Sequence, residues 1–192
     1  TALSTPPTFL KHLPVARDAW AYANEVHAGQ TRRFDGRPFM AHPQEVAELL
    51  HAAGGSDHVV AAGLLHDAIE RTDVTTSDLE HRFGHEVAAL VRSLTEDSAI
   101  KPYRKRKAAL RRQAIAGGPE AAAVFAADKI SKIRQYRAQL SPGSDSAEAP
   151  RARRLDHYVQ SLRLLEQAIP GHPLVRQLGS ELASLEASPS AY

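Results

Sequence analysis

Residues 61–70 (Ala-Ala-Gly-Leu-Leu-His-Asp-Ala-Ile-Glu) restrict how this chain can fold more than any other segment. The segment is apolar enough for a protein core, yet it carries the adjacent polar residues His66 and Asp67. Burying polar side chains without partners is costly, and a metal ion bound by both side chains would offset that cost. If the segment is helical, Glu70 lies one turn after His66 and shares its face. The segment therefore predicts a buried helix beside a metal site.

Composition favours a helical domain. Hydrophobic residues make up 43% of the chain and aromatic residues only 6%, and β-branched runs such as Val59-Val60 are short. These proportions suit packed aliphatic helices better than a β-sandwich. The length of 192 residues suits one domain. We therefore predict an all-α fold with eight or more helices.

Capping and turn signals divide the chain into predicted helices. Helices are expected at about 14–26, 42–53, 57–72, 78–83, 85–94, 103–116, 119–140, 151–168 and 173–186. Ser56 and Ser77 are the expected N-caps of the third and fourth helices. Residues 141–150 are rich in Ser, Pro and Gly and form the linker-like segment. We expect residues 1–140 to form the main domain and the helices of residues 151–192 to pack on it.

Composition also argues against several classes of protein. No stretch reaches the about 18 apolar residues of a membrane span, and the N-terminal residues show no signal-peptide pattern. The absence of cysteine rules out disulfides and thiolate metal ligands, and it fits the cytoplasm. A formal net charge of +2 argues against nucleic acid as the partner. Residues 101–112 carry seven Lys and Arg residues, which we interpret as a solvated face that can also supply phosphate contacts.

Two residues outside this segment are further candidate ligands. His42 opens the second predicted helix, and Asp128 lies in an Ala-rich helix. Two imidazoles and two carboxylates suit a divalent cation such as Mn²⁺, Fe²⁺ or Zn²⁺, which lowers the pKa of a bound water towards neutrality. Taken singly, His42 is also compatible with a simple helix start and Asp128 with a buried ion pair. A His-Asp pair also arises by chance in a chain with ten histidines, so the pair alone does not decide.

Four motifs carry a family resemblance. They are residues 27–33 (HAGQTRR), 36–43 (GRPFMAHP), 64–72 (LLHDAIERT) and 127–129 (ADK). In this order and at these separations they resemble the hydrolase domain of the RelA/SpoT family, which belongs to the HD superfamily. The short length is similar to that of the stand-alone small alarmone hydrolases, including the metazoan SpoT homologues. The resemblance covers about residues 14–140, with no synthetase or regulatory domain attached.

This resemblance implies a function in alarmone metabolism and the stringent response. It implies one bound Mn²⁺ ion and hydrolysis of the 3′-pyrophosphate of guanosine or adenosine alarmones, (p)ppGpp or (p)ppApp, to the nucleotide and pyrophosphate. The implied metal ligands are His42, His66, Asp67 and Asp128. Glu70 matches the acid that positions or activates the attacking water. The basic residues expected to contact the nucleotide substrate are Arg32, Arg33, Lys129, Lys132 and Arg134.

Two positions depart from the family pattern. The family usually has Glu-Asp-Thr after the His-Asp pair, whereas this chain has Glu70-Arg71-Thr72, so Arg71 occupies the position of a second catalytic acid. The family also tends to have Asn at the position of Lys132. Both changes add positive charge near the expected phosphate site, and Arg71 is equally compatible with a substrate contact and with a solvent-facing arginine. The alternatives are therefore an HD phosphohydrolase acting on another nucleotide such as NADPH, or a catalytically silent nucleotide-binding module.

Overall fold

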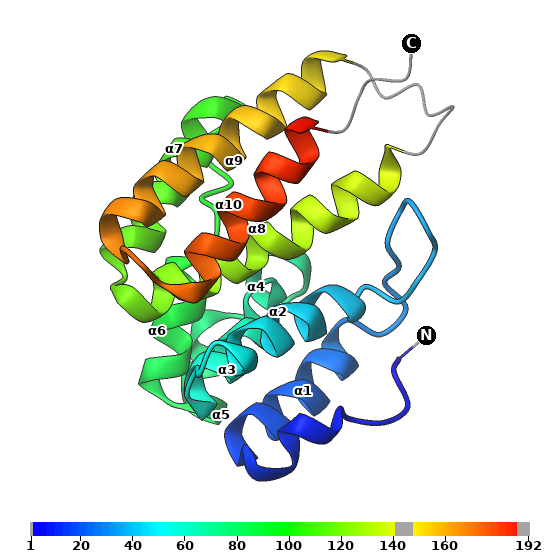
Figure 1. The fold of residues 1–192 in the computed structure, drawn as a ribbon. Coiled ribbons are helices and arrows are strands. Elements are labelled where there is room, and N and C mark those ends of the chain that lie inside the picture. The colour runs from blue at the N-terminus through cyan, green and yellow to red at the C-terminus, as the bar shows by residue number, and fades with distance from the viewer. Residues whose placement is uncertain (1, 141–147, 188–192) are drawn as a thin grey trace.

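The computed structural model describes residues 2–140 and 148–187, most of which are α-helical (Figure 1). Within those ranges no strand forms, and the extended contact present is an isolated antiparallel bridge between Thr31 and Pro38. No helix of the described ranges is long and apolar enough to cross a lipid bilayer. The predicted all-α fold is confirmed.

The described residues form ten α-helices and one short 3-10 helix, which agrees with the prediction of eight or more. In chain order they are η1 (Thr8–His12), α1 (Pro14–Val26), α2 (Ala41–Ala52), α3 (Asp57–Leu65), α4 (Ala68–Arg71), α5 (Thr76–Phe83), α6 (His85–Ser93), α7 (Tyr103–Ala116), α8 (Pro119–Gln139), α9 (Glu148–Ala168) and α10 (Pro173–Ala187).

The single helix predicted over residues 57–72 is wrong, because the structure divides it into α3 and α4. His66 still has helical dihedral angles, with φ −59° and ψ −27°. Asp67 departs from them, with φ −97° and ψ −2°, and is the N-cap residue of α4. The His-Asp pair therefore lies at the junction of two helices.

Two further helix boundaries differ from the prediction. α5 begins after Thr75 rather than Ser77, because Thr75 and Asp78 form a reciprocal capping box. α9 begins at Glu148, inside the predicted linker. The remainder of that linker, residues 141–147, lies outside the described residues.

α3 is the central helix of the core. Its residues from Val59 to Leu65 are all buried, and it packs against α1, α2, α6 and α8. Gly63 permits a close approach of α2, since a Cβ atom there would lie 2.6 Å from Leu50 Cδ1. The middle of α2 thereby lies against the C-terminal half of α3.

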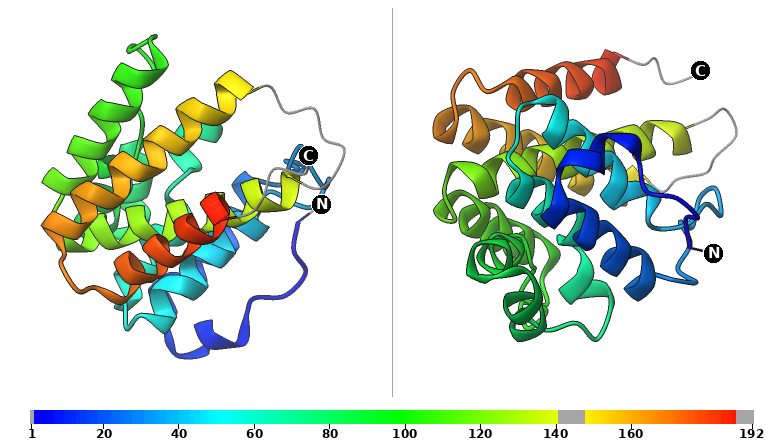
Figure 2. Two further views of the ribbon diagram at one scale, coloured as in Figure 1. Left: turned by 45° about the horizontal axis from the view of Figure 1, so that its top comes forward. Right: turned by 90° about the horizontal axis from the view of Figure 1, so that it is seen from below.

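The C-terminal helices cover α8. Both α9 and α10 pack against α8, and α9 also packs against α7 (Figures 1 and 2). Arg134 of α8 donates to Glu181 of α10 with an Nε–Oε1 distance of 2.8 Å, and Arg137 pairs with the same carboxylate. The helices that follow the predicted linker therefore lie against the same body as those that precede it.

Gly55 tests the importance of the turn that sets α2 against α3. Its N–H donates to the Leu50 carbonyl oxygen at 2.8 Å, and an added Cβ would lie 2.8 Å from that oxygen. We expect Gly55→Ala to lower the free energy of unfolding by about 1–3 kcal/mol, measured by urea denaturation, because backbone atoms must move.

Gly179 in α10 provides the matched control. An added Cβ there meets nothing closer than 3.9 Å, so Gly179→Ala is expected to be neutral or to stabilise the protein by up to about 1 kcal/mol. Equal unfolding free energies for the two variants would contradict the role assigned to the Gly55 turn.

Candidate functional site

Three buried side chains from three helices converge on one point. His42 lies in the first turn of α2, His66 at the end of α3 and Asp128 in the middle of α8. The Nε2 atoms of His42 and His66 are 3.2 Å apart, and they lie 3.1 Å and 3.2 Å from Asp128 Oδ1. Since ligand atoms of these residues all lie within 4.8 Å of one another, they can hold one metal ion.

The opposite nitrogen of each imidazole is occupied by a hydrogen-bonding group. His66 Nδ1 lies 2.7 Å from the Gly63 carbonyl oxygen, which can only accept. Nδ1 of a neutral His66 therefore carries the proton, and the Nε2 lone pair faces the cluster. His42 Nδ1 lies 2.8 Å from Ser131 Oγ and 3.0 Å from Gln135 Nε2. Such outer contacts are typical of histidines that ligate metals, because they fix the ring orientation.

Asp67 adds a fourth candidate ligand to the same cluster. Its buried Oδ2 atom accepts no hydrogen bond, and it lies 3.6 Å from His42 Nε2 and 3.4 Å from His66 Nε2. Burial alone would raise the pKa of Asp67, but the charges of His66 and Lys132 outweigh it and hold the pKa below its usual range. A buried carboxylate oxygen without a donor is costly. The donor set therefore fits a divalent cation, which would satisfy that atom.

Two lysines of α8 balance the charge of Asp128. Lys129 Nζ lies 2.7 Å from Asp128 Oδ2, and Lys132 Nζ lies 3.1 Å from the same carboxylate. Lys129 is 1% exposed, and burial lowers its pKa to about 8. Burial also opposes the charge of Lys132, but Asp128 and Asp67 outweigh it and raise its pKa. Lys129 and Lys132, both predicted substrate contacts, thus lie next to the cluster of candidate metal ligands.

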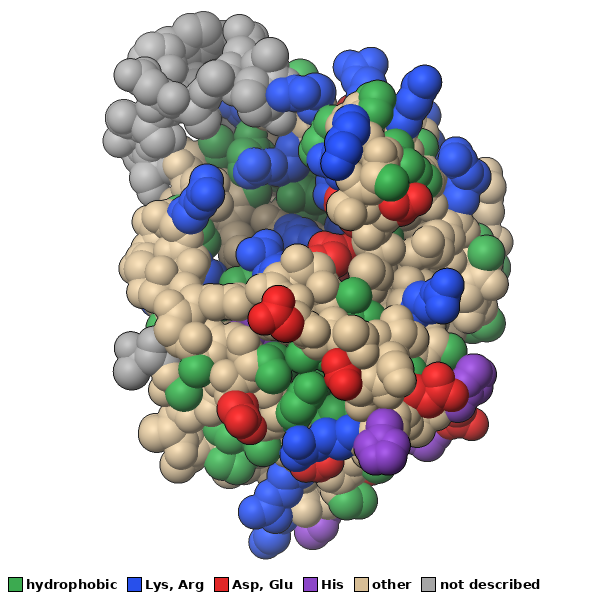
Figure 3. Space-filling view, turned by 180° about the vertical axis from the view of Figure 1, so that it is seen from behind, with side chains coloured by type: hydrophobic (Ala, Val, Ile, Leu, Met, Phe, Trp, Pro, Cys, Tyr) green, Lys and Arg blue, Asp and Glu red, His purple; other side chains and the backbone are tan. Residues whose placement is uncertain are grey.

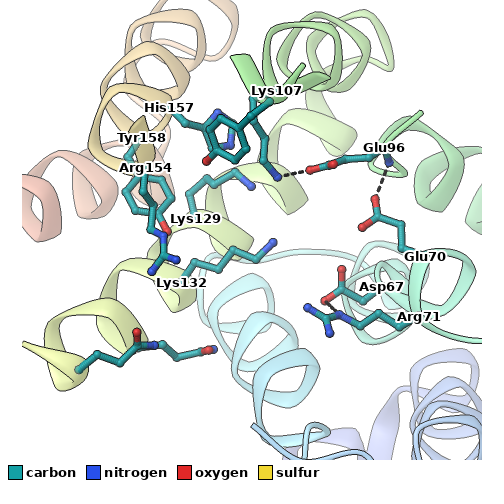
Figure 4. A pocket seen from close by; sticks show the side chains of 13 residues that line it. Asp67, Glu70, Arg71, Glu96, Lys107, Lys129, Lys132, Arg154, His157 and Tyr158 are labelled. Atoms are coloured by element: carbon teal, nitrogen blue, oxygen red, sulfur yellow. Dashed lines mark hydrogen bonds and ion pairs between the residues drawn. The ribbon is translucent and has the colours of Figure 1, made fainter. Parts of the chain in front are cut away.

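A cleft of about 330 Å³ opens beside the cluster, with opposite charges on its two walls. Figure 4 shows the acidic side chains on one wall and the basic side chains on the other. The acidic wall carries Asp67, Glu70 and Glu96. The basic wall, formed by α7, α8 and α9, carries Lys107, Lys129, Lys132 and Arg154.

Glu70 is fixed on the acidic wall by a backbone contact. Its Oε1 atom accepts a hydrogen bond from the Glu96 N–H. Burial raises the pKa of Glu70, and the charge of Asp67 acts in the same direction. The Glu96 carboxylate pairs with Lys107 and with Arg106, whose Nε lies 2.8 Å from Glu96 Oε2. This chain of contacts links the two walls of the cleft at its α7 end.

A second cavity of about 580 Å³ adjoins the cleft. Arg32 and Arg33, both predicted substrate contacts, line it. Arg32 pairs with Asp35, and its guanidinium carbon lies 4.8 Å from the centroid of the Phe34 ring. The residues that line both cavities are Arg71, Gln135, Gln139 and Arg154. On the face shown in Figure 3, Lys and Arg side chains gather around a hollow.

The structure separates Arg134 from the other predicted substrate contacts. Arg134 lines neither cavity and pairs with Glu181, so the geometry gives it a part in holding α10 against α8. The residues of the cleft that the sequence did not single out are Glu96, Tyr103, Gln135, Gln139, Arg154, His157 and Tyr158. The basic run of residues 101–112 indicated that Lys107 could contact phosphate. No local sequence pattern indicated that Arg154, His157 and Tyr158 of α9 would line the cleft.

Known proteins resemble this chain in sequence. A family model described as an HD domain matches residues 19–158. A probable guanosine-3′,5′-bis(diphosphate) 3′-pyrophosphohydrolase of Synechocystis is 43% identical over 89 residues, which are 46% of this chain and 11% of that protein. Human guanosine-3′,5′-bis(diphosphate) 3′-pyrophosphohydrolase MESH1 is 39% identical over 120 residues, which are 61% of this chain and 66% of that protein. The chain thus spans under two thirds of these relatives.

Two solved structures share the fold. One, described as a metazoan ortholog of SpoT that hydrolyzes ppGpp, has a TM-score of 0.73 and 23% identity and covers 95% of this chain and 98% of its own. The other, lmo0812 of Listeria monocytogenes, has a TM-score of 0.69 and 30% identity over 78% of this chain and 98% of its own.

Ser131 tests the orientation of His42. We expect Ser131→Ala to weaken Mn²⁺ binding about tenfold, because one outer contact of His42 is lost while Gln135 remains beside Nδ1. The measurement is titration of the metal-free protein with Mn²⁺ by calorimetry. Ser161→Ala, which removes a buried hydroxyl that donates to the His157 carbonyl oxygen, is the control and should leave the affinity unchanged. Equal affinities of the parent and Ser131→Ala would contradict the assignment.

His157 predicts a pH dependence of stability. It is 3% exposed, and Arg111 donates to its Nδ1 atom at 2.9 Å. Burial and the cations of Lys129 and Lys107 lower its pKa far below the usual value, so the folded protein keeps it neutral. The unfolded chain takes up a proton below about pH 6.5, so stability is complete above that pH and falls below it, by up to about 1.4 kcal/mol per pH unit.

His157→Asn removes this titration and keeps an acceptor for Arg111. Urea unfolding at several pH values between 5 and 8 should show that the parent loses more stability on acidification than the variant does. The other ionisable groups are the same in both proteins, so their contributions cancel in the comparison. Parallel stability curves for the two proteins would contradict the prediction.

Proposed function

Because this chain belongs to the HD domain family, we propose that it is a metal-dependent hydrolase that removes the 3′-pyrophosphate from a guanosine or adenosine alarmone. The products would be the nucleotide and pyrophosphate. The observation that carries the proposal is the cluster of His42, His66 and Asp128 at the edge of a cleft with a basic wall. Relatives whose names specify guanosine-3′,5′-bis(diphosphate) 3′-pyrophosphohydrolase activity support the same reaction class.

The proposed cofactor is one Mn²⁺ ion. The residues that would hold it are His42, His66, Asp67 and Asp128. Imidazole nitrogen and carboxylate oxygen suit Mn²⁺, and also Fe²⁺ and Zn²⁺. When bound, the ion supplies Lewis-acid chemistry at the phosphorus centre. The absence of cysteine from the chain supports the cytoplasmic location expected from the sequence.

The two walls of the cleft have different roles in the proposed hydrolysis: the acidic wall activates water and the basic wall binds the pyrophosphate group. Glu70 orients the attacking water and accepts its proton, since burial raises the pKa of Glu70 towards the range suited to a general base. The ammonium groups of Lys107, Lys129 and Lys132 face it from the basic wall and bind the pyrophosphate group. Positive charge fixed in this position stabilises the negative charge that builds up on the transferred group. The bond between phosphorus and the ribose 3′ oxygen breaks as the bond to water forms, and the 3′ oxygen leaves with the bonding electrons and takes up a proton from solvent to become the 3′ hydroxyl.

Arg71 favours a second candidate function. A cation stands at the end of the acidic wall, where it attracts a polyanion and opposes a metal ion. This arrangement suits a phosphohydrolase that acts on another phosphorylated nucleotide, such as NADPH. Comparing products from several nucleotides separates the two candidates, and binding without turnover would indicate a nucleotide-binding module.

The test is incubation of the Mn²⁺-loaded protein with ppGpp, ppApp and NADPH, followed by chromatography of the products. We expect pyrophosphate from an alarmone, no activity in His66→Ala, and a rate about 10²–10⁴-fold lower in Glu70→Gln, because the general base is lost. Glu48→Gln, a substitution in α2 at a residue that lines neither cavity, is the control and should keep full activity. A parent protein that binds Mn²⁺ but leaves every alarmone intact would overturn the proposal.

A further inference from the structure

Arg71 is an exception to the separation of acidic and basic side chains on the two walls of the cleft. The other lining cations come from α7, α8 and α9, whereas Arg71 ends α4 on the wall that carries Asp67 and Glu70. Figure 4 shows Arg71 beside Asp67 and across the cleft from Lys132 and Arg154. A cation among the acids next to a metal cluster opposes metal binding, so its presence calls for another role.

The Arg71 side chain is held by stacking. Its guanidinium carbon lies 4.4 Å from the centroid of the Phe39 ring, and Gln30 donates to the Arg71 carbonyl oxygen at 3.0 Å. Arg71 Nε forms an ion pair with Asp67 Oδ2 at 3.6 Å, a distance too long for a hydrogen bond. Within the described residues, the side chain of Arg71 makes no hydrogen bond, and half of its surface is exposed. The contact with Phe39 positions the guanidinium and leaves its N–H edge available for further hydrogen bonds.

This available edge lies between the two cavities. Arg71 lines both the cleft of the metal cluster and the second cavity, which also contains Phe34 and Arg32. In the proposed function, the scissile pyrophosphate binds to Lys107, Lys129 and Lys132 of the basic wall. A ligand that also fills the second cavity must pass Arg71, whose donors match two oxygens of a phosphate group.

We infer that Arg71 binds a second, non-scissile phosphate group of the substrate and so selects nucleotides that are phosphorylated on both sides of the ribose. The inference rests on the proposed function, which places the scissile group at the metal cluster. In this role Arg71 is a substrate-binding residue, and the position after Glu70 does not supply a second acid. A nucleotide that is phosphorylated only at the scissile position lacks this contact.

The test is calorimetric binding of guanosine 5′-diphosphate, guanosine and pyrophosphate to the Mn²⁺-loaded protein. We expect Arg71→Gln to weaken binding of guanosine 5′-diphosphate about 10- to 100-fold, because a charged hydrogen-bonding pair is lost. Binding of guanosine and of pyrophosphate should not change. Arg71→Lys should recover part of the affinity, since it restores the charge without the planar donors.

Arg82→Gln is the matched control. Arg82 also stacks on an aromatic ring, 4.6 Å from the Tyr22 centroid, and pairs with Asp18, but it lines neither cavity. Its replacement should leave binding of all three ligands unchanged. Metal content is measured in each variant, so that a change in Mn²⁺ binding is not mistaken for a change in nucleotide binding.

Three results would overturn the inference: unchanged binding of guanosine 5′-diphosphate in Arg71→Gln, an equal loss for guanosine, or no binding of guanosine 5′-diphosphate to the parent. The equal loss would indicate contact with the base. The proposed hydrolase fails separately, if the parent turns over no alarmone. Selective loss of guanosine 5′-diphosphate binding would support the role of Arg71 even then.

Discussion

The meeting of α2, α3 and α8 at one buried cluster is the constraint on which the rest of the structure depends. His42 and His66 each place Nε2 within 3.2 Å of Asp128 Oδ1, out of contact with solvent. Buried carboxylates are tolerated only when opposite charges or hydrogen-bond donors compensate them. Lys129 and Lys132 supply that charge to Asp128, whereas Asp67 Oδ2 has no donor. The packing of apolar helix faces thus creates a cluster that a divalent cation completes.

The same packing separates the charges of the cleft. The acids follow α3 and α6 in the chain, whereas the lysines project from α7 and α8, so different helices build the two walls. A polyanion bound between these walls would meet positive charge on one side and the carboxyl group of Glu70 on the other. Glu96 joins the walls through its pairs with Lys107 and Arg106. Arg71 departs from this pattern, and its stacking on Phe39 shows that the departure is built into the wall.

Sequence reasoning reached the helices and the cluster because both leave local signals. Apolar periodicity, Gly and Pro marked most helices, and polar residues inside apolar segments marked His66 and Asp128. The prediction of a single helix over residues 57–72 was wrong because the apolar pattern continues through Asp67, where the backbone dihedral angles leave the regular helix between α3 and α4. The family resemblance also grouped Arg134 with Lys129 and Lys132 as substrate contacts. In the structure Arg134 pairs with Glu181 of α10 and lines neither cavity.

The sequence by itself predicted the all-α class and the candidate ligands from residue types and short spacings, and its resemblance to a known family marked Arg71 as unusual. Only the tertiary structure decided which other residues line the cleft beside the candidate ligands and Arg71. Glu96, Lys107 and Arg154 enter the cleft from loops and helices distant in the chain. Their positions depend on how apolar faces of α7, α8 and α9 pack together, and such packing has no signature within a single segment. The junction occupied by Arg71 arises from the same cause, since the other residues that line both cavities, Gln135, Gln139 and Arg154, come from α8 and α9.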